Sequence, residues 1–285
     1  MEPLKLGQIE VTRVLESLTP TSPRFLFPGI APQDFAPYLP WLAPHFYVPA
    51  DDRFLMSIQA FIVRTPHHTI LVDTCVGNDK KRGNPLWNLQ QGPFLERLQA
   101  AGVTPGQVDF VLCTHLHVDH VGWNTRLVNG RWEPTFPNAR YVFNRSEYEF
   151  WSQAREEEQA ETFRDSVLPI LEAGKAELVS GAYEITAGVV LEPTPGHTPG
   201  HCSVHLGGAG GPEAVITGDM MHHPLQLLQP ERCSRFAWNP ALARLTRRTF
   251  LERYAERDVR IVGTHFAPPT HGRVVGHQDA FRLET

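Results

Sequence analysis

Thr114-His115-Leu116-His117-Val118-Asp119-His120-Val121-Gly122 is the stretch that decides how this sequence is interpreted. It follows residues 108–113, a compact apolar run that predicts a buried strand. If that strand continued into the histidines, the alternation of side chains would point His115, His117 and Asp119 one way and His120 another. Imidazole and carboxylate groups in this pattern favour zinc, iron, manganese or cobalt over calcium or magnesium. A polar loop that is rich in histidine by chance is the alternative, and it does not account for the cluster beginning where the apolar run ends.

The composition is that of a globular protein. Of the 285 residues, 41% are hydrophobic and 20% are charged, and the net charge of −5 argues against a broad basic surface for nucleic acid. No stretch approaches the roughly 18 apolar residues that a membrane span needs. The N-terminus does not have the pattern of a signal peptide. We therefore expect a cytoplasmic protein with no nucleic-acid or membrane partner.

The four cysteines are scattered along the chain, and none forms a C-x-x-C pair. This spacing fits neither a thiolate zinc site nor a disulfide framework. Most of these cysteines are expected to be buried thiols.

Apolar runs alternate with helical patterns along most of the chain. Ser146, with Glu149 three residues later, resembles a capping box at the start of a helix. No linker divides the series, so we predict one α/β domain over residues 1–285. Further helices are expected at 94–101, 166–173 and 240–257, and strands at 57–63, 69–73, 108–113, 140–143, 177–179, 189–191, 202–206, 214–216 and 259–263.

Residues 18–51 differ from the rest, because they combine many prolines with large aromatic side chains. Proline at this density forbids a long helix or a central strand, and the aromatic content excludes polar disorder. The segment is therefore interpreted as an arm or lid packed on an apolar surface. Trp41, Phe46 and Tyr47 would cover a substrate pocket, form a homodimer contact, or do both.

Three isolated polar residues further along each follow a predicted strand. They are His197 in Pro195-Gly196-His197, Asp219 in Thr217-Gly218-Asp219, and His265 in Gly263-Thr264-His265. Polar residues just beyond strand ends are where α/β enzymes place their chemistry. Glycine and proline beside them allow the sharp turns that hold a side chain at a fixed angle.

In this order, the motifs resemble those of the metallo-β-lactamase superfamily. They are Asp73 after an apolar strand, the H-x-H-x-D-H run, His197, Asp219 and His265, and together they span residues 58–271. The resemblance implies an αββα sandwich, in which two mixed β-sheets are flanked by helices and the site lies at one edge.

The resemblance also implies a site for two divalent metal ions, with zinc preferred and iron, manganese or cobalt as alternatives. A hydroxide bridging the ions would attack the substrate, Asp119 would carry its proton, and Asp73 would orient the ligand loop. One ion would be held by His115, His117 and His197, the second by Asp119, His120 and His265, and Asp219 would bridge them.

The sequence around the run and around Asp219 is similar to the branch that contains N-acyl-homoserine lactonases and methyl-parathion-hydrolase-like enzymes. The best-known small lactonases have a tyrosine three residues after the bridging aspartate, and His222 stands there instead. An imidazole can also donate a hydrogen bond to a substrate oxygen, so His222 is a candidate catalytic residue. A purely structural histidine is the equal alternative.

The expected reaction is hydrolysis of a small-molecule lactone or related ester, with activity toward phosphotriesters or aryl esters as a secondary expectation. A β-lactam hydrolase remains open, because its acyl-transfer chemistry is close. From another class, an iron-dependent oxidoreductase such as a sulfur dioxygenase also remains open, because these ligand types permit iron.

Overall fold

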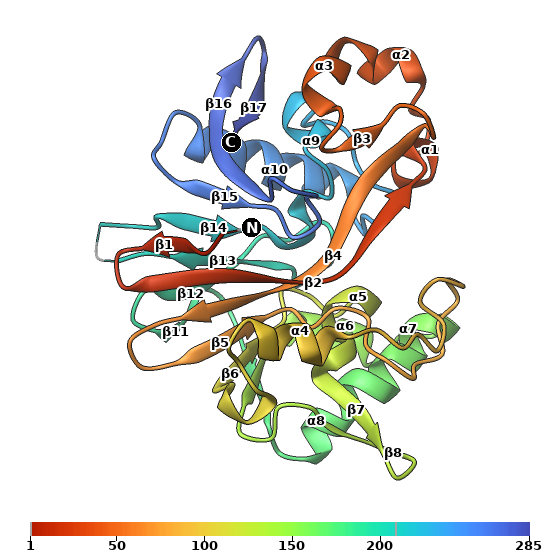
Figure 1. The fold of residues 1–285 in the computed structure, drawn as a ribbon, viewed down its shortest axis with the longest axis vertical. Helices are drawn as coiled ribbons and strands as arrows, with labels where there is room; N and C mark the ends of the chain where they lie inside the picture. Colours follow the sequence, from red (N-terminus) through yellow and green to blue (C-terminus); the bar gives the residue numbers. More distant parts are fainter. Residues whose placement is uncertain (1, 209) are drawn as a thin grey trace. The chain divides into compact units, whose positions relative to one another are not determined.

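A computed structural model describes residues 2–208 and 210–285, which form two compact units (Figure 1). The first unit contains Glu2–Glu16 and Ile58–Thr186, and the second contains Ser17–Ser57 and Ala187–Thr285. Each unit combines strands of a mixed β-sheet with helices, so the predicted α/β class is confirmed. The prediction of one domain over the whole chain stays a prediction.

The first unit is built on a sheet whose order is β1-β2-β4-β5-β6-β9-β10. Strands β5, β6, β9 and β10 run parallel to one another, so their carboxyl ends meet at one edge. Asp73 and the histidine-rich run follow the neighbouring strands β5 and β6 at this edge, where α/β proteins place their sites. The elements are β1 (Leu4–Leu6), β2 (Ile9–Thr21, of which residues 17–21 belong to the second unit), β4 (Arg53–Arg64, of which residues 53–57 belong to the second unit), β5 (Thr69–Val72), α4 (Phe94–Ala100), η2 (Pro105–Gln107), β6 (Phe110–Leu112), α5 (Val118–Val121), η3 (Gly122–Asn124), β7 (Thr125–Val128), β8 (Arg131–Pro134), β9 (Arg140–Asn144), α6 (Arg145–Trp151), α7 (Glu157–Thr162), the π-helix η4 (Phe163–Val167), α8 (Leu168–Glu172), β10 (Ala176–Val179) and β11 (Tyr183–Thr186).

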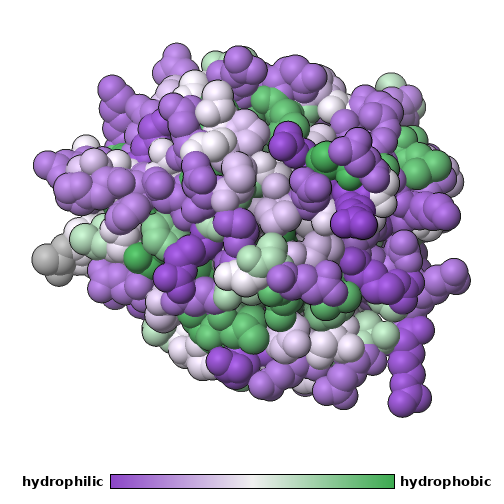
Figure 2. Space-filling view, turned by 90° about the horizontal axis from the view of Figure 1, so that it is seen from below, coloured by the Kyte–Doolittle hydropathy of each residue, from purple (hydrophilic) through white to green (hydrophobic). Residues whose placement is uncertain are grey.

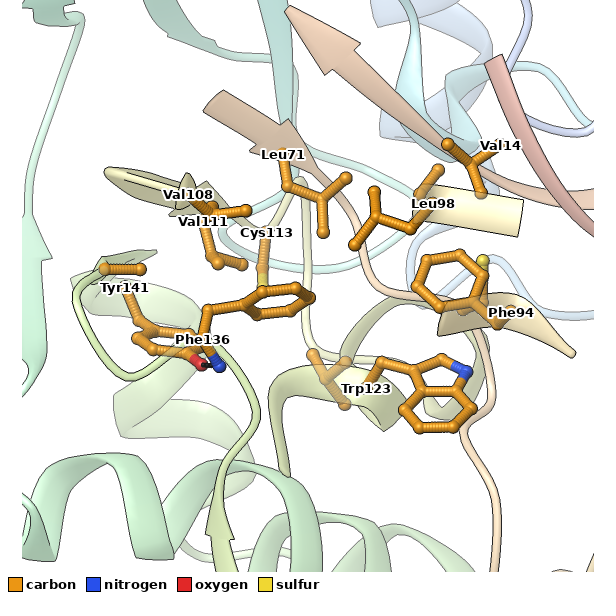
Figure 3. Close-up of a cluster of buried hydrophobic side chains, with 14 of the residues drawn as sticks. Val14, Leu71, Phe94, Leu98, Val108, Val111, Cys113, Trp123, Phe136 and Tyr141 are labelled. Carbon is orange, nitrogen blue, oxygen red and sulfur yellow. Dashed lines mark hydrogen bonds between the residues drawn. The ribbon is translucent and has the colours of Figure 1, made fainter. Parts of the chain in front are cut away.

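A buried apolar cluster supports this edge of the first unit (Figure 3). Leu71 and Val111 come from β5 and β6, and they pack in one cluster with Phe136 and Tyr141. The Tyr141 hydroxyl accepts a hydrogen bond from the Phe136 amide and donates one to the Asn124 carbonyl. Burial of these side chains therefore fixes the strand ends from which the site residues extend.

The second unit contains the sheet order β12-β13-β14-β15-β16-β17, and the last two strands form the C-terminal hairpin of Figure 1. Strands β14 and β15 are parallel, so Asp219 and His265 follow neighbouring carboxyl ends. The elements are α1 (Pro23–Leu26), α2 (Pro32–Phe35), η1 (Ala36–Tyr38), α3 (Leu39–Leu42), β3 (Tyr47–Val48), β12 (Val189–Pro193), β13 (Cys202–Leu206), β14 (Ala214–Ile216), η5 (Gly218–Met220), α9 (Leu225–Leu228), α10 (Pro240–Tyr254), β15 (Arg260–Val262), β16 (His271–His277) and β17 (Ala280–Glu284).

The proline-rich arm, residues 18–51, lies in the second unit and contains the end of β2, the short helices α1, α2, η1 and α3, and the two-residue strand β3. Each of α1, α2, η1 and α3 has proline in its first two positions, where a missing amide hydrogen costs nothing. Phe46 and Tyr47 are only 2% and 7% exposed and pack in a cluster with Phe54 and Leu225. These two side chains therefore belong to the core of their own unit, and they are not available to cover an open pocket. Trp41 is half-buried beside them.

The structure corrects three local predictions. Strand β6 ends at Leu112, so the strand does not continue into the histidines, and helix α5 begins instead at Val118. The N-cap of α6 is Asn144, whose side chain accepts the amide of Ser146, so the predicted capping box is wrong. No strand was predicted beyond residue 263, but β16 and β17 follow β15.

The buried thiols were predicted correctly, since Cys75, Cys113 and Cys202 are buried and all four cysteines are free. Among the described residues, no helix is both long and apolar enough to cross a bilayer. Figure 2 shows one face on which hydrophilic side chains predominate and hydrophobic ones form smaller patches.

Candidate metal centre

In the first unit, helix α5 divides the histidine-rich run into two pairs. His115 and His117 precede the helix, and the ring atoms His115 Nε2 and His117 Nδ1 are 3.0 Å apart. Asp119 and His120 lie inside the helix, with 3.7 Å between Asp119 Oδ1 and His120 Nε2. The side chains of the run were expected to point in two directions because of an extended strand. They are instead divided between a loop and the helical turn that follows it.

Asp73 orients the second of these pairs. Its carboxylate accepts the amide and the hydroxyl of Thr114, and its Oδ2 lies 2.9 Å from His120 Nδ1. A carboxylate on Nδ1 fixes the ring tautomer, and it leaves Nε2 as the atom that can bind a metal ion. Asp73, His115 and His120 are completely buried. The orienting contact predicted for Asp73 is present.

Helix α6 supplies two contacts that the sequence analysis did not identify. The buried carboxylate of Glu147 accepts the Leu116 amide at 3.2 Å and the Trp151 indole N–H at 2.6 Å. The Trp151 ring lies 5.2 Å from the His117 ring. Strand β9, which precedes this helix, pairs in parallel with β6. A prediction that β6 and β9 are parallel neighbours would have placed α6, which follows β9, beside the histidine-rich run, which follows β6.

In the second unit, one carboxylate has three imidazoles around it. Asp219 Oδ2 lies 3.3 Å from His197 Nε2 and 3.3 Å from His222 Nε2, and Asp219 Oδ1 lies 3.0 Å from His265 Nε2. All four side chains are at most 5% exposed. Because its two oxygens face different histidines, Asp219 has the arrangement expected of a bridging carboxylate.

Backbone and histidine contacts hold these side chains in place. His265 Nδ1 lies 2.8 Å from the Ser57 carbonyl, and His201 Nε2 accepts the Asp219 amide at 2.8 Å. Gly196, which precedes His197, has φ +134°, and a Cβ there would lie 2.4 Å from the Ala243 amide nitrogen. Only glycine fits this turn, as the sequence context indicated. His201 thus fixes the backbone from which the Asp219 carboxylate extends.

His222 is 3% exposed and held on several sides. Its ring stacks on Phe236 and on His265, with centroid distances of 6.0 and 5.7 Å. The Ser234 hydroxyl lies 3.4 Å from Nε2, and the His222 amide donates to the Gln226 side chain at 2.7 Å. The ring packs like that of a core residue, but one of its nitrogens faces Asp219. Its position is therefore compatible with a catalytic role and with a purely structural one.

Comparison with known proteins identifies the group to which the sequence belongs. Residues 54–247 match the metallo-beta-lactamase superfamily. The chain belongs to this superfamily. The predicted family and its fold are therefore confirmed, and mixed sheets with helices are what the two units contain.

Relatives within the metallo-β-lactamase superfamily include lactonases. An N-acyl homoserine lactonase of Bacillus cereus is 29% identical over 164 residues, which are 52% of this chain and 58% of that protein. The N-acyl homoserine lactonase AttM of Agrobacterium fabrum (strain C58 / ATCC 33970) is 32% identical over 130 residues, which are 42% of this chain and 43% of that protein. The matched region thus spans little more than half of the first relative and less than half of the second.

Solved structures of the superfamily match nearly the whole chain. The hydrolase AbOPH of the beta-lactamase superfamily has a TM-score of 0.82 and 26% identity, with 99% of this chain and 95% of that chain covered. The dizinc quorum-quenching lactonase AidC has a TM-score of 0.80 and covers 99% of this chain and 96% of its own. Its identity is 19%, so this likeness concerns the fold alone.

The donor atoms within each unit fit the metal ions of this superfamily. Two ligands bound about 2.05 Å from one tetrahedral zinc ion are about 3.3 Å apart. The separations of 3.0 Å between His115 and His117, and of 3.3 Å between His197 and Asp219, are close to that spacing. These nitrogen and oxygen donors suit zinc, and they permit iron, manganese or cobalt.

Proposed function

We propose that this protein is a dinuclear metal-dependent hydrolase that opens a lactone or a related small-molecule ester. The observation that carries the proposal is Asp219, whose two carboxylate oxygens face different imidazoles in a chain of the metallo-β-lactamase superfamily. The two relatives described above, which are named as N-acyl homoserine lactonases, support the lactone as the first substrate to test.

The ligand roles follow the motif order of the superfamily. When bound, divalent ions of this kind make hydroxide available at neutral pH and polarise a carbonyl oxygen. Zinc is the preferred ion, because it has no redox chemistry of its own. In the proposal, His115, His117 and His197 would hold one ion, Asp119, His120 and His265 would hold the second, and Asp219 would be shared between them.

Asp119 is the proposed proton carrier. Its side chain is 14% exposed, whereas the neighbouring His120 is buried, so Asp119 keeps some access to water and substrate. Ring opening adds one water molecule across the ester bond. Asp119 would accept a proton from the attacking water and return it to the leaving alkoxide, which becomes the hydroxyl group of the product acid.

His222 is proposed to act on the substrate through its imidazole. A neutral imidazole can donate one hydrogen bond, and a substrate carbonyl or leaving oxygen is an acceptor. The stacked Phe236 and His265 rings would keep the imidazole in one orientation. A fixed donor is more effective than a mobile one, because it needs no reorganisation during the reaction.

The test is a hydrolysis panel on the zinc-loaded full chain. It contains N-acyl homoserine lactones of several chain lengths, a simple lactone, an aryl ester, a phosphotriester and a β-lactam. His120→Ala is expected to abolish hydrolysis of every substrate that the parent turns over. His67→Ala is the matched control, because His67 is an exposed histidine of the same unit and is expected to leave rates unchanged.

The outcomes distinguish the proposal from its alternatives. Lactone turnover above the other substrates, lost in His120→Ala with the fold intact, would support it. Turnover of the β-lactam alone would replace the substrate class. One bound iron per chain together with oxygen uptake on a persulfide would contradict a hydrolase altogether.

A further inference from the structure

A strained loop follows strand β5 in the first unit. Asp73 and Cys75 have φ values of +57° and +53°, which residues other than glycine seldom adopt, and Gly77 has φ +81°. Such a conformation persists only where surrounding contacts enforce it. The loop matters because it carries Asp73, the carboxylate on His120 Nδ1.

The buried carboxylate of Glu16, on β2, supplies contacts that enforce this loop. Its Oε2 accepts the Val76 amide at 3.0 Å, and its Oε1 accepts the Gly77 amide at 3.2 Å and the Trp123 indole N–H at 2.8 Å. Glu16 is only 7% exposed. Burial raises the pKa of this carboxyl group, and hydrogen bonds from Val76, Trp123, Gly77 and the Gln90 side chain oppose the shift. A carboxylate is suited to this position, because both of its oxygens accept from N–H groups.

The same loop is bonded directly to the metal-ligand helix. The Thr74 amide donates to the His120 carbonyl at 2.8 Å, and the Gly122 amide donates to the Cys75 carbonyl at 2.7 Å. A Cβ on Gly122 would lie only 1.8 Å from the Val76 carbonyl oxygen. This close approach explains why glycine follows the histidine run. A shift of the loop would therefore displace both Asp73 and His120.

We propose that Glu16 is a positioning residue. It holds the loop 73–77 against α5 and thereby fixes the orientation in which His120 would bind its metal ion. The proposal rests on the proposed function only in that His120 binds metal. Glu16 acts through the amides of Val76 and Gly77 and through the Trp123 indole N–H, and it is not one of the proposed ligands. Loss of Glu16 should lower the affinity for the ion at Asp119 and His120 more than the affinity for the ion at His115 and His117.

The decisive variant is Glu16→Gln, which preserves size but replaces one acceptor oxygen with an NH₂ group that faces N–H donors. Zinc affinity is measured for the full chain by competition with a chromophoric chelator, and zinc per chain is measured after dialysis. Outer-shell partners of ligands typically change metal affinity about 10- to 100-fold. We expect a loss of that size for one ion of the two, with the other retained.

Two further variants separate positioning from general destabilisation. Glu10→Gln alters another glutamate of β2, one that pairs with Arg64 at 3.2 Å, and it should leave both affinities unchanged. Trp123→Phe removes the indole donor to Glu16 and keeps an aromatic ring, so it should lower the affinity for the same ion by a smaller factor. This milder variant keeps the test decisive if Glu16→Gln does not fold.

Thermal unfolding of the metal-free proteins is recorded in parallel. Selective loss of one ion at a temperature where the variant is folded supports the proposal. Unchanged zinc affinities in folded Glu16→Gln would overturn the positioning role and leave the hydrolase proposal standing. An equal loss of affinity for both ions would also overturn the positioning role. A parent chain that binds no zinc would overturn both proposals.

Discussion

Acid should destabilise the second unit through His223. This side chain is completely buried, and burial lowers its pKa to about 4 from 6.5. Its Nε2 lies 2.9 Å from the Phe46 carbonyl, and its Nδ1 accepts the Leu225 amide at 3.2 Å. The neutral ring thus donates on one side and accepts on the other. Protonation of Nδ1 would remove the acceptor and leave a charge among apolar side chains.

The size and direction of the effect follow from the two pKa values. Because the folded-state pKa lies below the unfolded one, the stabilisation is complete above pH 6.5 and is lost as the pH falls toward 4. The full shift corresponds to about 3 kcal/mol, and about 2 kcal/mol of that should be lost between pH 7.5 and pH 5. The contact to Phe46 implies that the proline-rich arm loosens first.

Urea unfolding of the metal-free chain at pH 7.5 and pH 5 provides the assay. The His223→Gln variant keeps an amide donor toward Phe46 but does not titrate. Its free energy of unfolding should fall about 2 kcal/mol less than that of the parent over the same interval. His67→Gln, at an exposed position, should behave like the parent. Equal losses in the parent and in His223→Gln would refute the reasoning.

Two further substitutions test buried contacts by thermal and urea unfolding. Asp165 accepts two hydrogen bonds from Arg82 and lies 3.4 Å from Lys80, whose pKa burial lowers to about 7. Asp165→Ala should therefore lower the free energy of unfolding by about 3 to 5 kcal/mol, because the buried Arg82 guanidinium loses its counter-charge and Lys80 loses an acceptor; a loss below about 1 kcal/mol would contradict this. Gly196→Ala should cost about 2 kcal/mol or more and reduce zinc binding, because its Cβ would meet Ala243; parent-like unfolding and zinc content would contradict that.

The sequence was informative where strands end in polar residues. His197, Asp219 and His265 were chosen because each follows an apolar run, and the structure places them beyond β12, β14 and β15. Parallel pairing of β14 with β15 then explains why Asp219 and His265 meet. Local hydrophobic patterns are sufficient to locate such strand ends.

Other parts of the site depend on contacts that no local pattern records. Glu16 is one acidic residue in a strand, and Glu147 is one in a helix, so neither differs from a solvent-exposed carboxylate in sequence. Their roles appear only when loop amides meet them in space. The helix at Val118 was missed because alternation in three polar residues fits a strand and a loop equally well.

The measurement that tests the central claim most directly is a zinc titration of the metal-free full chain, with hydrolysis of an N-acyl homoserine lactone followed at each step. The proposed dinuclear site predicts two bound ions per chain, with turnover that appears as the second ion binds. In His120→Ala, one ion should remain and turnover should be absent. Full turnover with a single ion per chain, or two bound ions without hydrolysis of any lactone or ester, would contradict the account.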